Sequence, residues 1–344
     1  MKINSFFVIS LVLLTCLSGC QKEGNMPGDG GLVQFSTATY VHQVKSDPDP
    51  AFPTTSDIGA FAWKSANAWT SSPSLTSYMT NVQAVYDSEK SVWAPVTAYK
   101  WPTSGYLHFL CYSPYKAASP FSWNQTDGLT VSSYTVPSTA DEDLCYSDIT
   151  IDEQRERNVA MPASILMRHA LCKVSFNVEA ADAPENLSVV SVAVSDVTVK
   201  LSNIKNSGSF AAANDVGGKW SGAAWSAQTG AAEYTYDSYL NGFILMPQTL
   251  TNTGSGDQQF TINYTATVTY KDAATLEDTN IEFTKEETHP LFLEGICESW
   301  GVNEHIVYNI SVNLFEGEIT FTPTHTDWED NTATMKIGYE DPLI

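Results

Sequence analysis

The sequence predicts an all-β protein made of two tandem β-sandwich domains, on three observations. Charged residues make up only 16% of the 344 residues, whereas aromatic residues reach 12%; together with abundant Thr, Ser and Val, this composition favours strands over helices. Short stretches of alternating apolar and polar residues follow one another at spacings of about 8–12 residues, with turn residues between them, as in sandwiches. No amphipathic helical pattern of ten or more residues occurs.

The chain starts with a pattern typical of a secretory signal peptide. Lys2 supplies a positive charge, and the apolar run Phe6–Leu14 follows, interrupted only by Ser10. This run is shorter than the ~20 apolar residues that span a bilayer. The small residues Ser18 and Gly19 come behind it, where a signal peptidase cuts. We therefore predict export.

The stretch Leu17–Cys20 resembles the lipobox of bacterial lipoproteins. The resemblance implies cleavage between Gly19 and Cys20, so that residues 1–19 are the signal peptide, and acylation of Cys20. Acyl chains anchor a protein to a membrane because each buried methylene contributes ~0.8 kcal/mol, and stable attachment takes more than one chain. The glycine-rich residues 20–31 are then a lipidated tether at the outer membrane. The alternative is a soluble secreted protein in which Cys20 is incidental.

Ten segments of the remaining chain carry strand patterns. Val82, Ala84 and Tyr86 alternate with polar residues, and residues 306–314 alternate in the same way, as on a half-buried strand. The predicted strands are Leu32–Val41, Ile58–Trp63, Asn81–Asp87, Gly105–Pro114, His169–Val178, Val189–Leu201, Phe243–Leu250, Phe260–Tyr270, Glu304–Phe315 and Glu318–Pro323.

The longest polar stretch, residues 138–164, predicts a boundary between two domains near its end. The N-terminal sandwich would cover residues 32–163, and the C-terminal sandwich would cover residues 164–344. Both lengths suit a single domain of ~100–200 residues.

Four cysteines remain in the predicted mature chain besides Cys20: Cys111, Cys145, Cys172 and Cys297. In an exported protein, four cysteines permit two disulfides with three possible connectivities. Cys111 and Cys172 lie in apolar, strand-like contexts, where a cysteine often behaves as a small buried hydrophobe. We favour four buried thiols, with disulfides as the alternative.

Charge and motif content narrow the function classes. With 17 basic against 39 acidic residues, the net charge is −22, which excludes nucleic acid as a partner because phosphates require clustered Lys and Arg. The sequence contains no HExxH, CxxC, phosphate-loop or GxSxG motif, so no catalytic residue, cofactor or enzyme activity is expected.

Two groups of residues that could carry chemistry are interpreted as structural. His169, beside Arg168, is interpreted as a hydrogen-bonded residue of a strand. The acidic run Asp141–Asp143 offers hard oxygens for calcium, but we interpret it as solvated and predict no metal site.

Six motifs follow one another along the chain. They are Phe61–Trp63, Trp93–Tyr115 with Trp101-Pro102, Asp141–Asp148, Ile165–Val178, Phe243–Leu250 with Pro247-Gln248, and Trp300–Trp328 with Gly301 and Tyr308. Trp93, Phe109 and Tyr112 are expected to fill a core; Trp101 is expected to fix a strand end, and Trp300, Gly301 and Tyr308 to shape a turn and the strand that follows. Taken together and in this order, the motifs resemble the fimbrillin family of Bacteroidetes. The resemblance covers most of the mature chain, with Cys111 where a small residue is usual.

The family resemblance implies transthyretin-like sandwiches and a surface-exposed fimbrial (pilus) subunit that supports cell adhesion. Gln21–Gly24 resembles the tag that sends lipoproteins of these bacteria to the outer face of the cell. In the family, a trypsin-like protease removes the lipidated segment with the first strand, and an extended strand of the next subunit fills the groove. The implied partners are other fimbrial subunits and, through the lipid, the outer membrane.

Carried over to this chain, the first strand is Leu32–Tyr40 and the candidate maturation site is Lys45, because the first arginine is Arg155. The tail Asn331–Ile344 is a candidate donor strand, with alternating apolar residues such as Met335 on one face. Without cleavage at Lys45 the lipid stays, as in an anchor or accessory subunit. Stalk, tip and anchor roles are therefore all open.

A binding module is the alternative interpretation. A surface lipoprotein that does not polymerise would bind glycan or host matrix protein through exposed aromatics, since Trp and Tyr rings stack on sugars. The candidates are Trp63, Trp69 and Trp123. An enzyme with two catalytic carboxylates is a third class, but no pair of acidic residues is marked by its context.

Overall fold

The computed structural model describes residues 31–39, 52–158, 161–183, 188–214, 216–236, 242–315 and 318–328. Over these ranges the chain forms strands β1 to β22, one helical turn, α1 (Arg155–Asn158), and one 3₁₀ turn, η1 (Val216–Gly218). The predicted all-β fold is therefore confirmed. None of the described helical segments is long and apolar enough to cross a membrane.

The largest sheet closes on itself. Its strands are β1 (Phe35–Thr39), β2 (Ile58–Ser65), β3 (Thr76–Asp87), β4 (Val92–Pro95), β5 (Tyr106–Ser113), β8 (Cys145–Ser147), β9 (Thr150–Glu153) and β10 (Ala163–His169). They follow the order β2-β3-β4-β1-β10-β8-β5-β9, and β2 also pairs with β5. A closed ring is therefore formed by β2, β3, β4, β1, β10, β8 and β5. Each strand of a ring has a neighbour on both sides, so none of them is a free edge. The sequence does not predict this closure.

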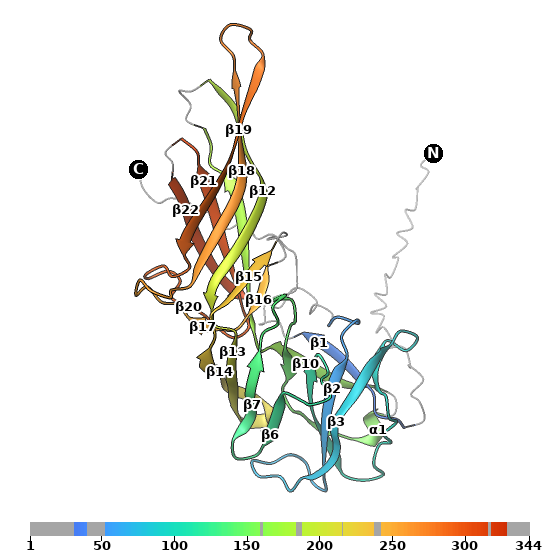
Figure 1. The fold of residues 1–344 in the computed structure, drawn as a ribbon. Helices are drawn as coiled ribbons and strands as arrows, with labels where there is room; N and C mark the ends of the chain where they lie inside the picture. The colour runs from blue at the N-terminus through green and yellow to red at the C-terminus, as the bar shows by residue number, and fades with distance from the viewer. Residues whose placement is uncertain are drawn as a thin grey trace, which may run out of the picture.

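A second sheet packs against the ring to complete the first body of the molecule (Figure 1). Its strands are β6 (Phe121–Asn124), β7 (Gly128–Thr135), β13 (Ser207–Asn214) and β14 (Trp220–Thr229). Their order is β14-β13-β7-β6. Aromatic contacts join the two sheets: the Tyr146 and Phe210 rings are 5.2 Å apart, and those of Tyr112 and Phe121 are 5.7 Å apart.

The second body is a sandwich of two four-stranded sheets, β16-β11-β21-β22 and β15-β12-β18-β19. Phe176, on β11, joins them across the core, with its ring centroid 5.4 Å from that of Phe260 on β18, and it stacks on Tyr308 of the neighbouring strand β21 at 5.3 Å. Figure 1 shows the β18–β19 hairpin projecting away from the first body. The strands are β11 (Cys172–Ala180), β12 (Val189–Ile204), β15 (Ala232–Tyr236), β16 (Phe243–Leu245), β18 (Gln259–Lys271), β19 (Asp278–Pro290), β21 (Glu304–Asn313) and β22 (Glu318–Asp327), and a separate pair is formed by β17 (Gln248–Thr249) and β20 (Ser299–Trp300).

Two apolar cores meet at β5. Leu107, Phe109 and Cys111 belong to the core inside the ring, whereas Leu110 and Tyr112 belong to a larger core that continues into the second body. Successive side chains of a strand point to opposite faces, so a strand with a core on each face needs an almost unbroken apolar run. The two cores therefore explain why β5 is apolar on both of its faces.

The expected core residues are buried. Trp93, Phe109 and Tyr112 are all at most 4% exposed. Tyr308 is fully buried, and its hydroxyl accepts a 3.1 Å hydrogen bond from Nε1 of Trp300 and donates a 3.0 Å bond to the Leu291 carbonyl. These contacts fix Trp300, on β20, against Tyr308, on β21.

The polar stretch 138–164 is not a linker. It contains β8, β9 and α1, and Cys145, Tyr146 and Ser147 are buried. A boundary at residue 163 would also separate β10 from its neighbours β1 and β8 in the ring. The pairing fits a division after His169 better, with the β13–β14 hairpin returning from the second half of the chain to pair with β7 of the first body.

Candidate functional site

The segment 31–39 lies between strands that come from distant parts of the chain. β1 pairs with β10 in parallel, from Phe35 opposite Ala163 to Thr39 opposite Met167, and its other neighbour is β4. The backbone N–H of Ala163 donates to the Gln34 carbonyl at 2.9 Å, and the N–H of Val33 donates to the Tyr99 carbonyl at 2.8 Å. Hydrogen bonds thus hold this short segment on both sides.

Apolar side chains of the same segment enter the ring core. Phe35 is completely buried and Val33 is 1% exposed. The ring of Phe35 meets that of Phe109 edge to face, with centroids 5.2 Å apart. Trp101, expected to fix a strand end, is buried, and its Nε1 donates to the Leu32 carbonyl at 3.0 Å. Alternating apolar residues and paired backbone groups make this position a slot for one extended strand.

Several residues singled out in the sequence lie outside the described residues. They are Gly19, Cys20, Lys45 and the tail Asn331–Ile344 with Ala333, Met335 and Ile337. The signal peptide, lipid attachment, maturation site and donor strand therefore remain predictions.

The three candidate sugar-stacking tryptophans form one cluster. The ring of Trp123, on β6, is 4.5 Å from that of Trp63 and 6.5 Å from that of Trp69. All three are partly buried, so each keeps part of its surface accessible to solvent. Nε1 of Trp123 donates to Asn214 Oδ1 at 3.1 Å, which ties the cluster to β13. Figure 1 shows β6 at the end of the first body that points away from the second.

Polar groups fix the base of this tryptophan cluster. The backbone N–H of Trp69 donates to Asp152 Oδ1 at 2.6 Å, and the Trp69 ring lies 5.0 Å from that of the buried His108. Nδ1 of His108 accepts from the Asp152 backbone N–H at 3.1 Å, so its Nε2 carries the proton and donates to Ser65 Oγ at 2.8 Å. Burial lowers the pKa of His108, and Asp152 opposes this only partly. A neutral imidazole therefore supports the tryptophans.

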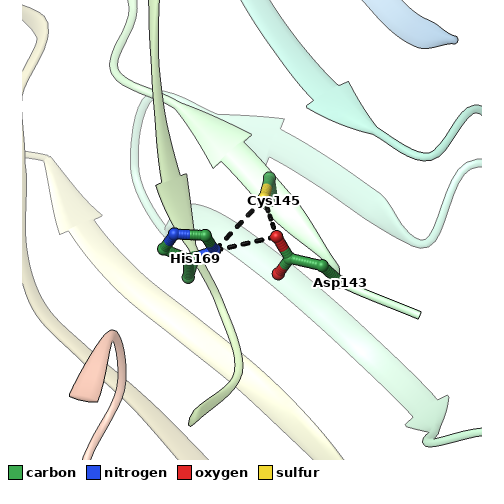
Figure 2. Close-up of side chains that lie close together, drawn as sticks. All are labelled: Asp143, Cys145 and His169. Carbon is green, nitrogen blue, oxygen red and sulfur yellow. Dashed lines mark hydrogen bonds and ion pairs between the residues drawn. The ribbon is translucent and has the colours of Figure 1, made fainter. Parts of the chain in front are cut away.

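A second polar cluster lies where the chain passes from the first body to the second. Nδ1 of His169 is 2.8 Å from Asp143 Oδ2 and 3.7 Å from Cys145 Sγ, and Cys145 Sγ is 3.1 Å from the same carboxylate oxygen (Figure 2). The His169 ring stacks on Trp328, with centroids 3.9 Å apart and planes 8° from parallel. His169 is thus hydrogen-bonded in a strand, as predicted.

The geometry of this cluster does not suit nucleophilic catalysis. A cysteine nucleophile needs its thiol at one imidazole nitrogen and the orienting carboxylate at the other. Here Asp143 and Cys145 both approach Nδ1 of His169. The imidazole cannot take a proton from the thiol at one nitrogen while the carboxylate holds the other.

The neighbouring acidic residues bind to other groups. Glu142 pairs with Lys116 and accepts a 2.9 Å hydrogen bond from the Tyr134 hydroxyl. Burial, with the Glu142 charge, raises the pKa of Tyr134 far above its usual value. Asp141 accepts a hydrogen bond from Thr139. Asp141, Glu142 and Asp143 therefore do not converge on one ion.

The cysteines are buried thiols, as favoured from the sequence. Cys111, Cys145, Cys172 and Cys297 are buried, and none forms a disulfide. Burial raises the pKa of Cys111 well above its ordinary value. The Cys172 thiol donates to the Leu245 carbonyl at 3.3 Å.

Comparisons with known proteins give a family and a set of similar folds. A family model described as fimbrillin-like matches residues 44–328. A fimbrial protein of Bacteroides vulgatus is 17% identical with a TM-score of 0.49, covering 86% of this chain and 99% of its own. A candidate cell adhesion protein of Bacteroides uniformis is 15% identical with a TM-score of 0.48, covering 87% and 99%. No curated protein matches the sequence significantly.

Proposed function

This chain belongs to the fimbrillin-like family, and on that premise we propose that it is a fimbrial subunit that assembles by strand exchange at the position of β1. Membership of the family supports a fimbrial or adhesion role at the cell surface and a role without catalysis. The assembly mechanism, the lipid anchor and the maturation step belong to the proposal.

The observation that carries the proposal is the position of β1 inside a closed ring. Removing β1 would open the ring between β4 and β10 and expose the unpaired backbone groups of both. It would also empty the sites of Val33 and Phe35, each of which contributes roughly 1.5–3 kcal/mol by burial. An opened subunit is therefore unstable until another extended segment with alternating apolar residues takes the slot.

The rest of the proposal concerns residues on either side of the described ring. Signal peptidase removes residues 1–19, lipid on Cys20 holds the subunit at the outer membrane, and residues 20–31 are the tether. Cleavage after Lys45 frees the segment that contains β1. The tail Asn331–Ile344 of a second subunit, with Ala333, Met335 and Ile337 on one face, then enters the slot.

The test is the N-terminus of the protein recovered from the cell surface, read by mass spectrometry together with a polymer ladder on partly denaturing gels. We expect a mature start at Ser46 and a ladder. Lys45→Ala should leave the start at acylated Cys20 and abolish the ladder, because β1 stays in its slot. Lys219→Ala, at an exposed lysine of the first body, should change neither. Wild-type protein that starts only at acylated Cys20 and forms no polymers would exclude assembly by strand exchange.

The tryptophan cluster supports glycan binding as a second candidate function. Trp63, Trp69 and Trp123 are far apart in the sequence. The fold places the ring of Trp123 4.5 Å from that of Trp63 and 6.5 Å from that of Trp69. Partly exposed indole rings held in place by hydrogen bonds are suited to stacking on sugar rings. This role is compatible with a fimbrial subunit.

Glycan arrays followed by titration of the best ligand test the second function. We expect Trp123→Ala to weaken binding about tenfold, since an aromatic contact contributes roughly 0.5–1.5 kcal/mol beyond the area it buries. Tyr270→Ala, on β18 of the second body, is the matched control and should bind like the wild type. Equal binding by both variants would remove the cluster as the site.

A further inference from the structure

Three side chains with different donor atoms converge at the junction of the two bodies: Asp143, Cys145 and His169. The local structure explains the convergence. Asp143 lies two residues before Cys145, the first residue of β8, and its carboxylate is 3.1 Å from the Cys145 sulfur, so the two side chains lie on the same side of the chain. His169, on β10, lies directly opposite Cys145, on β8, in the antiparallel register. Figure 2 shows the three side chains pointing toward one another.

The distances between the three donor atoms lie within about 0.5 Å of those between the ligands of one zinc ion. Zinc binds nitrogen and oxygen at about 2.0–2.2 Å and sulfur at about 2.3 Å, and tetrahedral angles then place the ligand atoms roughly 3.3–3.6 Å apart. The three atoms lie 2.8, 3.1 and 3.7 Å from one another. Adjustments of a few tenths of an ångström are enough, and Asp143, at 28% exposed, is the side chain with room to make them.

An unsatisfied polar atom gives an independent reason to expect a ligand. Among the described residues, Oδ1 of the Asp143 carboxylate is buried and has no hydrogen-bond partner. Such groups in a native protein call for an explanation, and an ion is one of the common ones. The neighbouring acids Glu142 and Asp148 are neutralised by Lys116 and Arg168, whereas Asp143 faces a histidine and a thiol.

The surroundings hold the histidine in position for ligation. His169 is 1% exposed and is stacked on Trp328, whose backbone N–H donates to the Asn303 carbonyl at 2.9 Å. A ligand whose ring cannot turn loses little entropy when it binds an ion. The partial exposure of Asp143 leaves a path from solvent to the cluster.

We propose that Asp143, Cys145 and His169 form a zinc site. The donor set of one sulfur, one nitrogen and one oxygen suits Zn²⁺ and not the hard cations Ca²⁺ and Mg²⁺, which take oxygen. On binding, the Cys145 thiol loses its proton to solvent as the S–Zn bond forms. The proton of His169 moves from Nδ1 to Nε2, so that the Nδ1 lone pair ligates the metal. One zinc then clamps β8 to β10 beside Trp328, independently of how subunits assemble.

The test is metal binding by the purified, uncleaved chain, which keeps β1, in metal-free buffer. With zinc sulfate and a chromogenic competitor, we expect one Zn²⁺ per chain, release of protons, and a higher Tm. With Co²⁺ in place of zinc, a thiolate-to-metal absorption band should appear. Cys145→Ser should remove the band and weaken zinc binding by about tenfold or more, a loss at least as large as that for removing an outer-shell partner.

Two further variants keep the result interpretable. Cys172→Ser changes another buried thiol, which donates to a backbone carbonyl, and it should keep the wild-type affinity and the cobalt band. Asp143→Asn alters the most exposed ligand, keeps the size of the side chain, and should weaken zinc binding by a similar factor. Absence of zinc binding by the wild type, or binding that Cys145→Ser and Asp143→Asn leave unchanged, would overturn the proposal.

Discussion

Replacing Phe35 with alanine is expected to lower the free energy of unfolding by about 3–5 kcal/mol, the range for removing a fully buried phenylalanine side chain. Phe35 is completely buried and packs edge to face on Phe109. Because β1 pairs with both β4 and β10, the backbone around the cavity cannot collapse without opening the ring. The measurement is guanidinium denaturation of the uncleaved chain, followed by tryptophan fluorescence.

The neighbouring Ser36 supplies the matched control. It sits in the same strand and is paired with Ser164, but it lies outside the buried core, so Ser36→Ala should change stability by less than about 0.5 kcal/mol, as is usual for surface sites. If Phe35→Ala lowers the free energy of unfolding no more than Ser36→Ala does, β1 contributes little to the stability of the ring. The slot proposed for strand exchange would then lose its energetic basis.

Strands that bury a distinct apolar set were predictable from the sequence. Ile306, Tyr308, Ile310 and Val312 of β21 are all buried, and the residues between them are half-buried. The alternation seen in the sequence is therefore the alternation of the pleat. β3 was found for the same reason, since Val82, Ala84 and Tyr86 lie at the ring core. β5 instead carries an apolar run with a core on each face.

Strands with few large apolar residues were missed. β13 has the sequence SGSFAAAN, whose small residues have low strand propensity. It is a strand because it pairs with β7 on one side and β14 on the other. β19 pairs with β18 over its whole length, yet its side chains are largely exposed and polar. β8 and β9 are so short that their polar flanks concealed them.

The candidate sites depended on the fold to different extents. Asp143 and Cys145 can be placed on one face from their spacing alone, but His169 joins them only through the register of β8 and β10. Trp63 and Trp123 meet because β2 lies in the ring while β6 lies in the sheet packed against it. Contacts of this kind arise from sheet order, which local sequence patterns do not encode.

Gly128→Ala is expected to destabilise the protein by several kcal/mol, because two effects add. The backbone of Gly128 has φ +77°, where a residue with a Cβ is strained by about 1–2 kcal/mol. An added Cβ would also lie 2.3 Å from the Ala212 backbone carbonyl oxygen. Strand β7 begins at Gly128, and this contact lies at the end of its pairing with β13, where Leu129 is opposite Ala212, so relief would require the two strands to move apart at about 1–3 kcal/mol more.

Gly217→Ala separates the two effects. Gly217 has φ +75°, nearly the same as Gly128, but a Cβ there would have nothing within 4 Å. Its substitution should therefore show only the conformational strain, and thermal unfolding should give a distinctly lower Tm for Gly128→Ala than for Gly217→Ala. Equal losses would mean that the β7–β13 approach is looser than the structure has it.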